Sequence, residues 1–91
     1  MLVVICYDIV SDRRRYRVAR WLEGHGERVQ ESVFECHLDR DRLRKVQSRL
    51  ATLIDPATDR VRYYLLCGKD AADVRFDGLG SPPRDVEQHV V

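Results

Sequence analysis

The sequence predicts one α+β domain with the ferredoxin-like βαββαβ order and an extra C-terminal strand. Its 91 residues are the length of a single domain. Apolar residues make up 44% of the chain and charged residues 34%, which is typical of a globular chain and excludes a disordered one. β-rich apolar runs also alternate with two segments whose apolar residues repeat at helical spacing. Such an alternation predicts two helices packed on one sheet.

The chain opens with a predicted strand and helix. Residues 1–9 are rich in β-branched and aromatic side chains and contain an aspartate near their end, so they predict the first strand. Ser11 or Asp12 can cap a helix over residues 13–23, because both side chains accept hydrogen bonds from free backbone amides. Two glycines then end this helix.

A long β-rich segment follows at residues 27–38. Its apolar positions change from one face to the other partway along, which predicts a bulge or a change of direction. A fold-back near residues 30–32 divides the segment into two strands. Only this division gives the βαββαβ order.

The second helix is predicted over residues 39–54, where apolar side chains recur every three or four positions. Asp39 or Asp41 can cap its start, and the proline at position 56 stops it. Residues 61–67 predict the next strand.

The remaining predicted strands are weaker. Residues 72–76 predict a short strand, and a loop rich in glycine and proline separates them from a terminal strand at residues 85–91. These elements come after the βαββαβ core.

The strands at residues 1–9 and 61–67 are apolar on both faces. Two helices can cover only one face of a sheet, and a large exposed apolar patch usually marks an interface. The sequence therefore predicts a homodimer that packs sheet to sheet around a two-fold axis. The alternative is that residues 68–84 cover the second face.

No apolar run approaches the length of about 20 residues that a membrane span needs. The N-terminal apolar run has no basic segment before it, so it predicts a strand and not a signal peptide. We therefore expect a cytoplasmic protein with no membrane contact. The three cysteines, at positions 6, 36 and 67, lie in apolar runs and form no C-x-x-C pair, which predicts buried thiols.

The candidate functional site lies where the first strand meets the first helix. Asp8 stands at the end of a buried strand, Asp12 follows at a turn, and three consecutive arginines come next. Carboxylates in such a place suit Mg²⁺, and arginines bind phosphate. The residues alone leave a second interpretation open, in which Asp8 ends a strand, Asp12 caps a helix and the arginines form a solvated face.

Two segments together carry a family resemblance. Residues 7–15 read Y-D-I-V-S-D-R-R-R, and residues 24–36 read G-H-G-E-R-V-Q-E-S-V-F-E-C. At this spacing and chain length, the sequence resembles the CRISPR-associated endoribonuclease family of the spacer-acquisition complex, the small partner of the CRISPR integrase. The resemblance extends through the terminal strand.

The resemblance implies a ferredoxin-like homodimer with a metal-dependent site. Asp8 matches the family's catalytic and metal-binding aspartate, and the two copies would face each other across the two-fold axis with Mg²⁺ or Mn²⁺ as cofactor. Arg14 and Arg15 match its helix-one arginines loosely and are carried over as phosphate contacts. Ser11 and Asp12 are accessory candidates.

The resemblance also implies a function: an endonuclease that hydrolyses single-stranded RNA or double-stranded DNA during spacer acquisition for antiviral defence. Integrase dimers would be its protein partners, and residues 85–91 would add a strand to the partner subunit's sheet. Two alternatives stay open. One is a non-catalytic dimeric scaffold that bridges integrase dimers and binds duplex DNA, and the other is a toxin-like ribonuclease of the same fold.

Overall fold

A computed structural model describes residues 1–66 and 88–90 of the chain. The predicted strand at 72–76 and the predicted loop at 68–84 lie outside these residues. The elements are β1 (Leu2–Asp8), α1 (Asp12–Glu23), β2 (Glu27–Gln30), β3 (Val33–His37), α2 (Arg40–Leu53), β4 (Arg60–Leu66) and β5 (Gln88–Val90).

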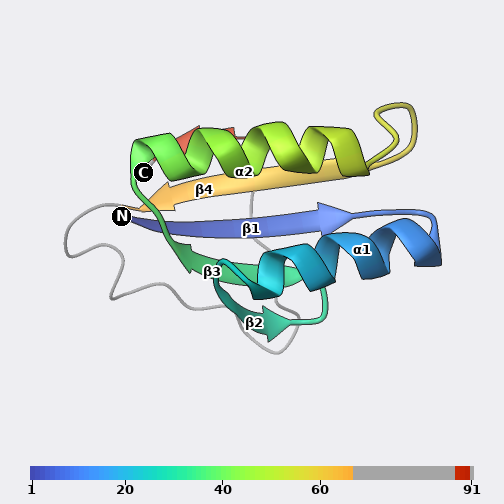
Figure 1. Cartoon of the computed structure of the whole chain (residues 1–91), viewed down its shortest axis with the longest axis horizontal. Helices are drawn as coiled ribbons and strands as arrows, with labels where there is room; N and C mark the ends of the chain where they lie inside the picture. The colour runs from blue at the N-terminus through green and yellow to red at the C-terminus, as the bar shows by residue number, and fades with distance from the viewer. Residues whose placement is uncertain (67–87, 91) are drawn as a thin grey trace.

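The strands form one sheet in the order β2-β3-β1-β4-β5. The central strand, β1, runs antiparallel to both β3 and β4. Both helices lie on the same face of the sheet (Figure 1). The predicted ferredoxin-like order is therefore confirmed.

Local capping sets where both helices begin. The Ser11 side chain accepts a hydrogen bond from the backbone amide of Arg14 at 3.3 Å. The Asp39 side chain accepts one from the amide of Arg42 at 2.8 Å. In each pair of predicted caps, the first residue is the one used, because it stands one position before the helix and reaches its third amide.

The predicted fold-back of residues 27–38 is also confirmed. β2 and β3 pair as an antiparallel hairpin, and their register shifts between Arg28 and Gln30. This irregularity explains the change of phase in the apolar pattern. Just before β2, Gly26 lies so close to β3 that a Cβ atom there would overlap the Glu35 carbonyl oxygen and the Cys36 sulfur.

The main core lies between the sheet and the helices. Val18, Ala19 and Leu22 of α1 are buried in it. Three residues of α2 are also buried there, at the predicted helical spacing: Leu43, Val46 and Leu50. Trp21 of α1 is half-buried against this core. Tyr16 of α1 lies outside this core, because 63% of it is exposed.

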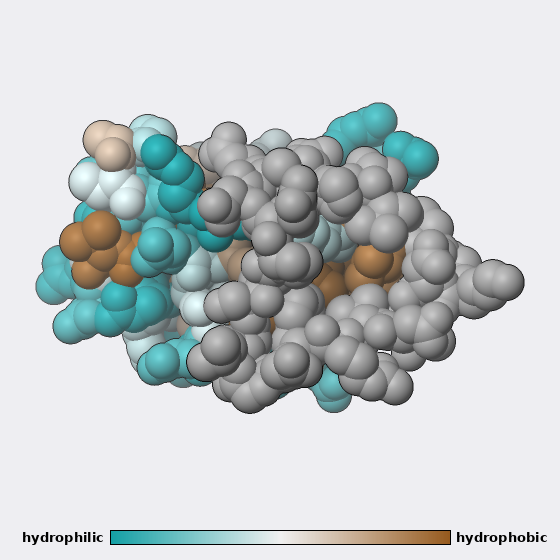
Figure 2. Space-filling model, turned by 180° about the vertical axis from the view of Figure 1, so that it is seen from behind, coloured by the Kyte–Doolittle hydropathy of each residue, from teal (hydrophilic) through white to brown (hydrophobic). Residues whose placement is uncertain are grey.

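The opposite face of the sheet carries a second apolar cluster. Figure 2 views the molecule from this side. The cluster consists of Leu2, Val4, Cys6, Val33, Tyr64 and Leu66, and every member is less than 9% exposed. Its side chains confirm that β1 and β4 are apolar on both faces. The homodimer expected from this second apolar face stays a prediction.

The terminal strand β5 pairs in parallel with β4 of its own chain, so that Tyr64 stands opposite His89. The family resemblance implies that residues 85–91 add a strand to the partner subunit's sheet. A single chain does not test that placement, and it stays a prediction.

Burial protects two of the three cysteines. Cys6 and Cys36 are free, buried thiols, as predicted, and Cys67 lies outside the described residues. Burial raises the pKa of the Cys6 thiol to about 12 and that of Cys36 to about 11. Both therefore stay protonated and unreactive at neutral pH. Among the described residues, no helix is long and apolar enough to cross a membrane.

Candidate functional site

Asp8 is the last residue of β1, and it stands opposite Arg60, the first residue of β4. Its backbone belongs to the sheet, which fixes its position. Asp8 itself is exposed, and within residues 1–66 and 88–90 no hydrogen-bond or ion-pair partner of its carboxylate is found. An anchored backbone and an unoccupied carboxylate make Asp8 available to a ligand.

Asp12 and Arg15 brace the turn that follows. Arg15 donates from Nη1 to the backbone carbonyl of Ile9 at 2.7 Å. Its other terminal nitrogen, Nη2, donates to the Asp12 carboxylate, which is otherwise almost fully exposed. Both residues therefore have a structural part in the β1–α1 turn. The predicted roles of Arg15 at phosphate and of Asp12 as an accessory residue stay predictions.

Arg14 is held by an aspartate that the sequence analysis does not single out. Its Nε donates to Oδ2 of Asp59 at 2.9 Å, and its Nη2 donates to Oδ1 at 3.4 Å. The Asp59 side chain is fully buried, and 30% of the Arg14 side chain is exposed. The Arg14 guanidinium is therefore hydrogen-bonded inside the protein, and part of the side chain is still exposed to solvent. Its predicted role at phosphate stays a prediction.

Asp59 is the centre of a buried polar network in the α2–β4 loop. Besides Arg14, it accepts hydrogen bonds from the amides of Val10 at 3.1 Å and Asp55 at 2.8 Å, and from the Thr58 hydroxyl at 3.0 Å. The hydrogen bond from Arg14 is the main cause that holds the pKa of Asp59 well below its ordinary value. Since Val10 lies two residues after Asp8, this network fixes the backbone beside the candidate site.

The strand end brings together some of the predicted residues. Asp8, Ser11 and Asp12 all lie where β1 turns into α1, and Ser11 is occupied as the α1 cap. No cluster of three or more metal-ligating side chains occurs in the part of the chain that the structure describes. One free carboxylate still fits Mg²⁺, because this ion usually takes one or two carboxylates and fills its other positions with water and phosphate oxygens.

The fold and the site define a class of protein: a small ferredoxin-like domain with a free carboxylate at the end of its central strand. Residues 1–74 match the model of the family described as CRISPR associated protein Cas2. The chain belongs to this family, which confirms the resemblance seen in the sequence.

The similarity to curated members covers nearly the whole chain. CRISPR-associated endoribonuclease Cas2 1 of Chloroflexus aurantiacus is 44% identical over 84 residues, which are 91% of this chain and 90% of the relative. CRISPR-associated endoribonuclease Cas2 3 of Synechocystis sp. is 45% identical over 82 residues, with 90% and 87% covered.

Solved structures agree with the fold. The crystal structure of Streptococcus pyogenes Cas2 at pH 6.5 aligns with a TM-score of 0.76 at 34% identity, over 86% of this chain and 100% of that one. A chain of the partial Cas6-RT-Cas1–Cas2 complex aligns with a TM-score of 0.64 at 28% identity, over 93% of this chain and 92% of that one.

Proposed function

We propose that this protein is a metal-dependent endonuclease that hydrolyses phosphodiester bonds in single-stranded RNA or double-stranded DNA during spacer acquisition. The observation that carries the proposal is Asp8, an exposed carboxylate without a partner among the described residues, on a strand end that the sheet holds in place. Two relatives support the proposal, because they are 44% and 45% identical to this chain and are named endoribonucleases.

In this proposal Asp8 holds the divalent cation. When bound, Mg²⁺ or Mn²⁺ supplies Lewis acidity at the phosphate and acidifies a water molecule. Arg14 and Arg15 orient the phosphate with the guanidinium nitrogens that their internal hydrogen bonds leave free, since each guanidinium carries five N–H donors. Ser11 keeps its place as the α1 cap and so fixes the start of the basic helix.

A homodimer would complete the site. Each chain supplies one free carboxylate at its strand end, and a second copy would bring another across a two-fold axis. Two carboxylates are at the upper end of what Mg²⁺ usually takes from a protein. The proposal therefore makes the dimer the active form.

The test is a cleavage assay of the wild type and Asp8→Asn on single-stranded RNA and on duplex DNA, with and without Mg²⁺. We expect cleavage only by the wild type with metal, and a loss of roughly a thousandfold in Asp8→Asn, because metal-assisted charge stabilisation is worth several kcal/mol. Asp41→Asn is the matched control, since it makes the same change at an exposed carboxylate on α2 that has no part in the candidate site. Equal cleavage by wild type and Asp8→Asn would overturn the proposal.

A second candidate function is a non-catalytic scaffold that binds duplex DNA and bridges integrase dimers. One observation favours it: the chain aligns along 93% of its length with a chain of the partial Cas6-RT-Cas1–Cas2 complex. A scaffold needs the fold and the arginines and does not need Asp8. Spacer insertion in cells that carry Asp8→Asn separates the two functions, because a scaffold would retain insertion and an obligatory nuclease would lose it.

A further inference from the structure

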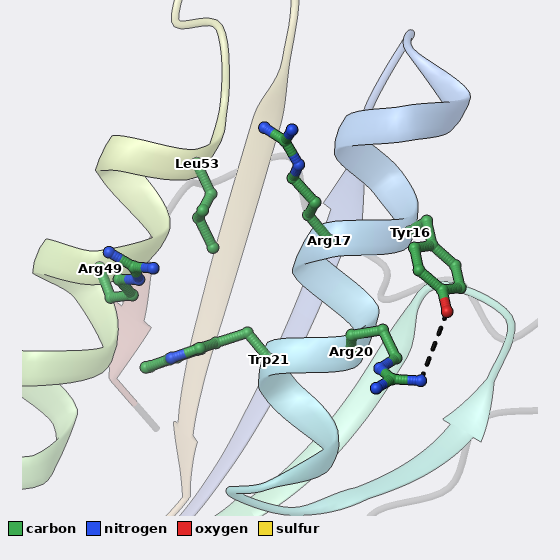
Figure 3. A pocket seen from close by; sticks show the side chains of 6 residues that line it. All are labelled: Tyr16, Arg17, Arg20, Trp21, Arg49 and Leu53. Carbon is green, nitrogen blue, oxygen red and sulfur yellow. Dashed lines mark hydrogen bonds between the residues drawn. The ribbon is translucent and has the colours of Figure 1, made fainter.

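A groove lies between the two helices, on the face of the molecule that α1 and α2 form. Its volume is about 420 Å³, and Figure 3 shows it from close by. The lining residues are Tyr16, Arg17, Arg20 and Trp21 from α1, and Arg49 and Leu53 from α2. Two separate elements thus build the groove, and none of its residues belongs to the candidate site at the end of β1.

The groove is strongly basic. Three of its six lining residues are arginines, and none is acidic. In the described part of the chain, the guanidinium groups of Arg17 and Arg49 have no hydrogen-bond or ion-pair partner. Arg20 donates to the Tyr16 hydroxyl at 3.4 Å. With no carboxylate among the residues that line the groove, the positive charges from two helices favour an anionic ligand with more than one charged group.

The floor of the groove is aromatic and apolar. In Figure 3, Trp21 extends from α1 toward α2 and lies near Arg49. His25 stacks on the indole with the ring centroids 4.0 Å apart, which holds the Trp21 ring in one orientation. Leu53 adds apolar surface from α2. A fixed aromatic ring among arginines is the combination that binds unpaired bases and the phosphates between them.

The groove leads toward Asp8. α1 begins and α2 ends at the end of the sheet where β1 ends (Figure 1). Arg17 is five residues into α1, so at 1.5 Å per residue its backbone lies about 8 Å along the helix from Asp12. Trp21 lies one turn further. A single-stranded nucleic acid held in the groove could therefore continue to the end of β1, which carries Asp8.

We propose that the α1–α2 groove binds single-stranded RNA, with Arg17, Arg20 and Arg49 on phosphates and a base against Trp21. The inference rests on the proposed function, since it adds a second contact surface for the substrate of Asp8. Duplexes are poor ligands for this groove because their bases are already stacked and shielded from Trp21. An acidic protein segment would pair with the arginines but would place no base against the indole ring of Trp21.

The experiment uses the full chain with Asp8→Asn, so that binding is read without cleavage. Trp21 is the only tryptophan in the sequence, and its fluorescence reports on the groove directly. We expect a short single-stranded RNA to quench this fluorescence as it binds. Arg17→Gln and Arg49→Gln should each weaken binding about fivefold to tenfold. Together they should reduce the slope of log affinity against log salt by about 1.4, because each phosphate contact on a single strand contributes about 0.7.

The matched control is Arg40→Gln, which removes the same charge from the same helix. Arg40 stands nine residues before Arg49, which is two and a half turns, so it lies on the other side of α2. We expect its affinity to stay within about twofold of the parent. Equal losses of RNA affinity in Arg40→Gln and Arg49→Gln would show that only the overall positive charge matters. That result would overturn the proposal that RNA binds in the groove.

Two further outcomes decide the ligand. Quenching of Trp21 by polyglutamate as strong as that by RNA would overturn the nucleic-acid assignment in favour of an acidic protein segment. RNA binding without quenching would also overturn it, because the strand would then lie elsewhere. Cleavage by the wild type tests the proposed function separately. Cleavage without quenching of Trp21 would overturn only the proposal that RNA binds in the groove. Quenching without cleavage would overturn only the proposed nuclease activity.

Discussion

Two aspartates lie at the same end of the sheet and differ in almost every physical respect. Asp59 precedes β4, is 2% exposed, and accepts hydrogen bonds from four other residues. Asp8 ends β1, is exposed, and has no side-chain partner among the described residues. Asp8 stands opposite Arg60 in the register of β1 and β4, and Asp59 is the residue just before Arg60.

The difference separates a structural carboxylate from an available one. The lone pairs of Asp59 are occupied by amides, a hydroxyl and a guanidinium, so it gains nothing from an outside cation. Asp8 keeps its lone pairs for a ligand. Asp59 also binds the amide of Val10, two residues beyond Asp8, and so supports the backbone of the available carboxylate. Four predictions test this contrast through stability, in order of decreasing effect.

Asp59→Ala should lower the free energy of unfolding by about 3 kcal/mol, because it leaves Arg14 and two backbone amides without their acceptor. Denaturant titration at one fixed protein concentration measures the loss. Asp12→Ala is the control, since that exposed carboxylate should contribute less than about 1 kcal/mol. Equal stability of the wild type and Asp59→Ala would refute the network's role.

The same network should make the stability of the fold depend on pH in the acidic range. The pKa of Asp59 is lower in the folded chain than in the unfolded one, so its ionised form stabilises the fold. This contribution is complete above the unfolded pKa of about 4 and is lost as the pH falls below it. Thermal midpoints measured from neutral pH down to about pH 2 should fall less steeply below pH 4 in Asp59→Asn than in the wild type. Parallel curves would contradict the prediction.

Arg14→Lys should have a smaller effect, about 1 kcal/mol of destabilisation. Lysine keeps the positive charge near Asp59 and loses the two-nitrogen contact that the guanidinium makes. A double-mutant cycle with Asp59→Asn measures the coupling between the two side chains. Additive effects would mean that the pair contributes nothing beyond its separate members.

Asp8→Asn should change stability least, by less than about 0.5 kcal/mol, because the side chain is exposed and the substitution keeps its shape. Equilibrium unfolding alongside the cleavage assay measures both properties in one preparation. A marked loss of stability would show that Asp8 has a structural role, and an accompanying loss of cleavage would then not identify it as the metal ligand.

The sequence predicts the fold well because the signals are local. The Ser11 and Asp39 caps, the helical spacing in α2 and the change of phase near Gln30 each act within a few residues. The family resemblance likewise rests on continuous segments. Asp8 could therefore be selected as the candidate residue from the sequence.

The sequence does not reveal the Asp59 network, because its hydrogen bonds from Arg14 and Val10 join residues 45 and 49 positions apart. For the same reason the sequence gives no sign that Arg14 also has a partner inside the protein, since Asp59 belongs to a loop that no local pattern connects to α1. A segment rich in turn-forming residues, D-P-A-T-D at 55–59, was the one available signal. It indicates a tight turn and does not indicate that its last aspartate is buried.

The close packing at the start of β2 predicts how the chain tolerates mutation. Gly24 and Gly26 both follow α1, and the sequence gives no reason to distinguish them. A Cβ at Gly24 would meet the Trp21 carbonyl oxygen at 3.5 Å, an ordinary contact, whereas one at Gly26 would overlap backbone and sulfur atoms of β3. In a library that samples every amino acid at both positions, selection for folded protein should recover many residues at position 24 and only glycine at position 26.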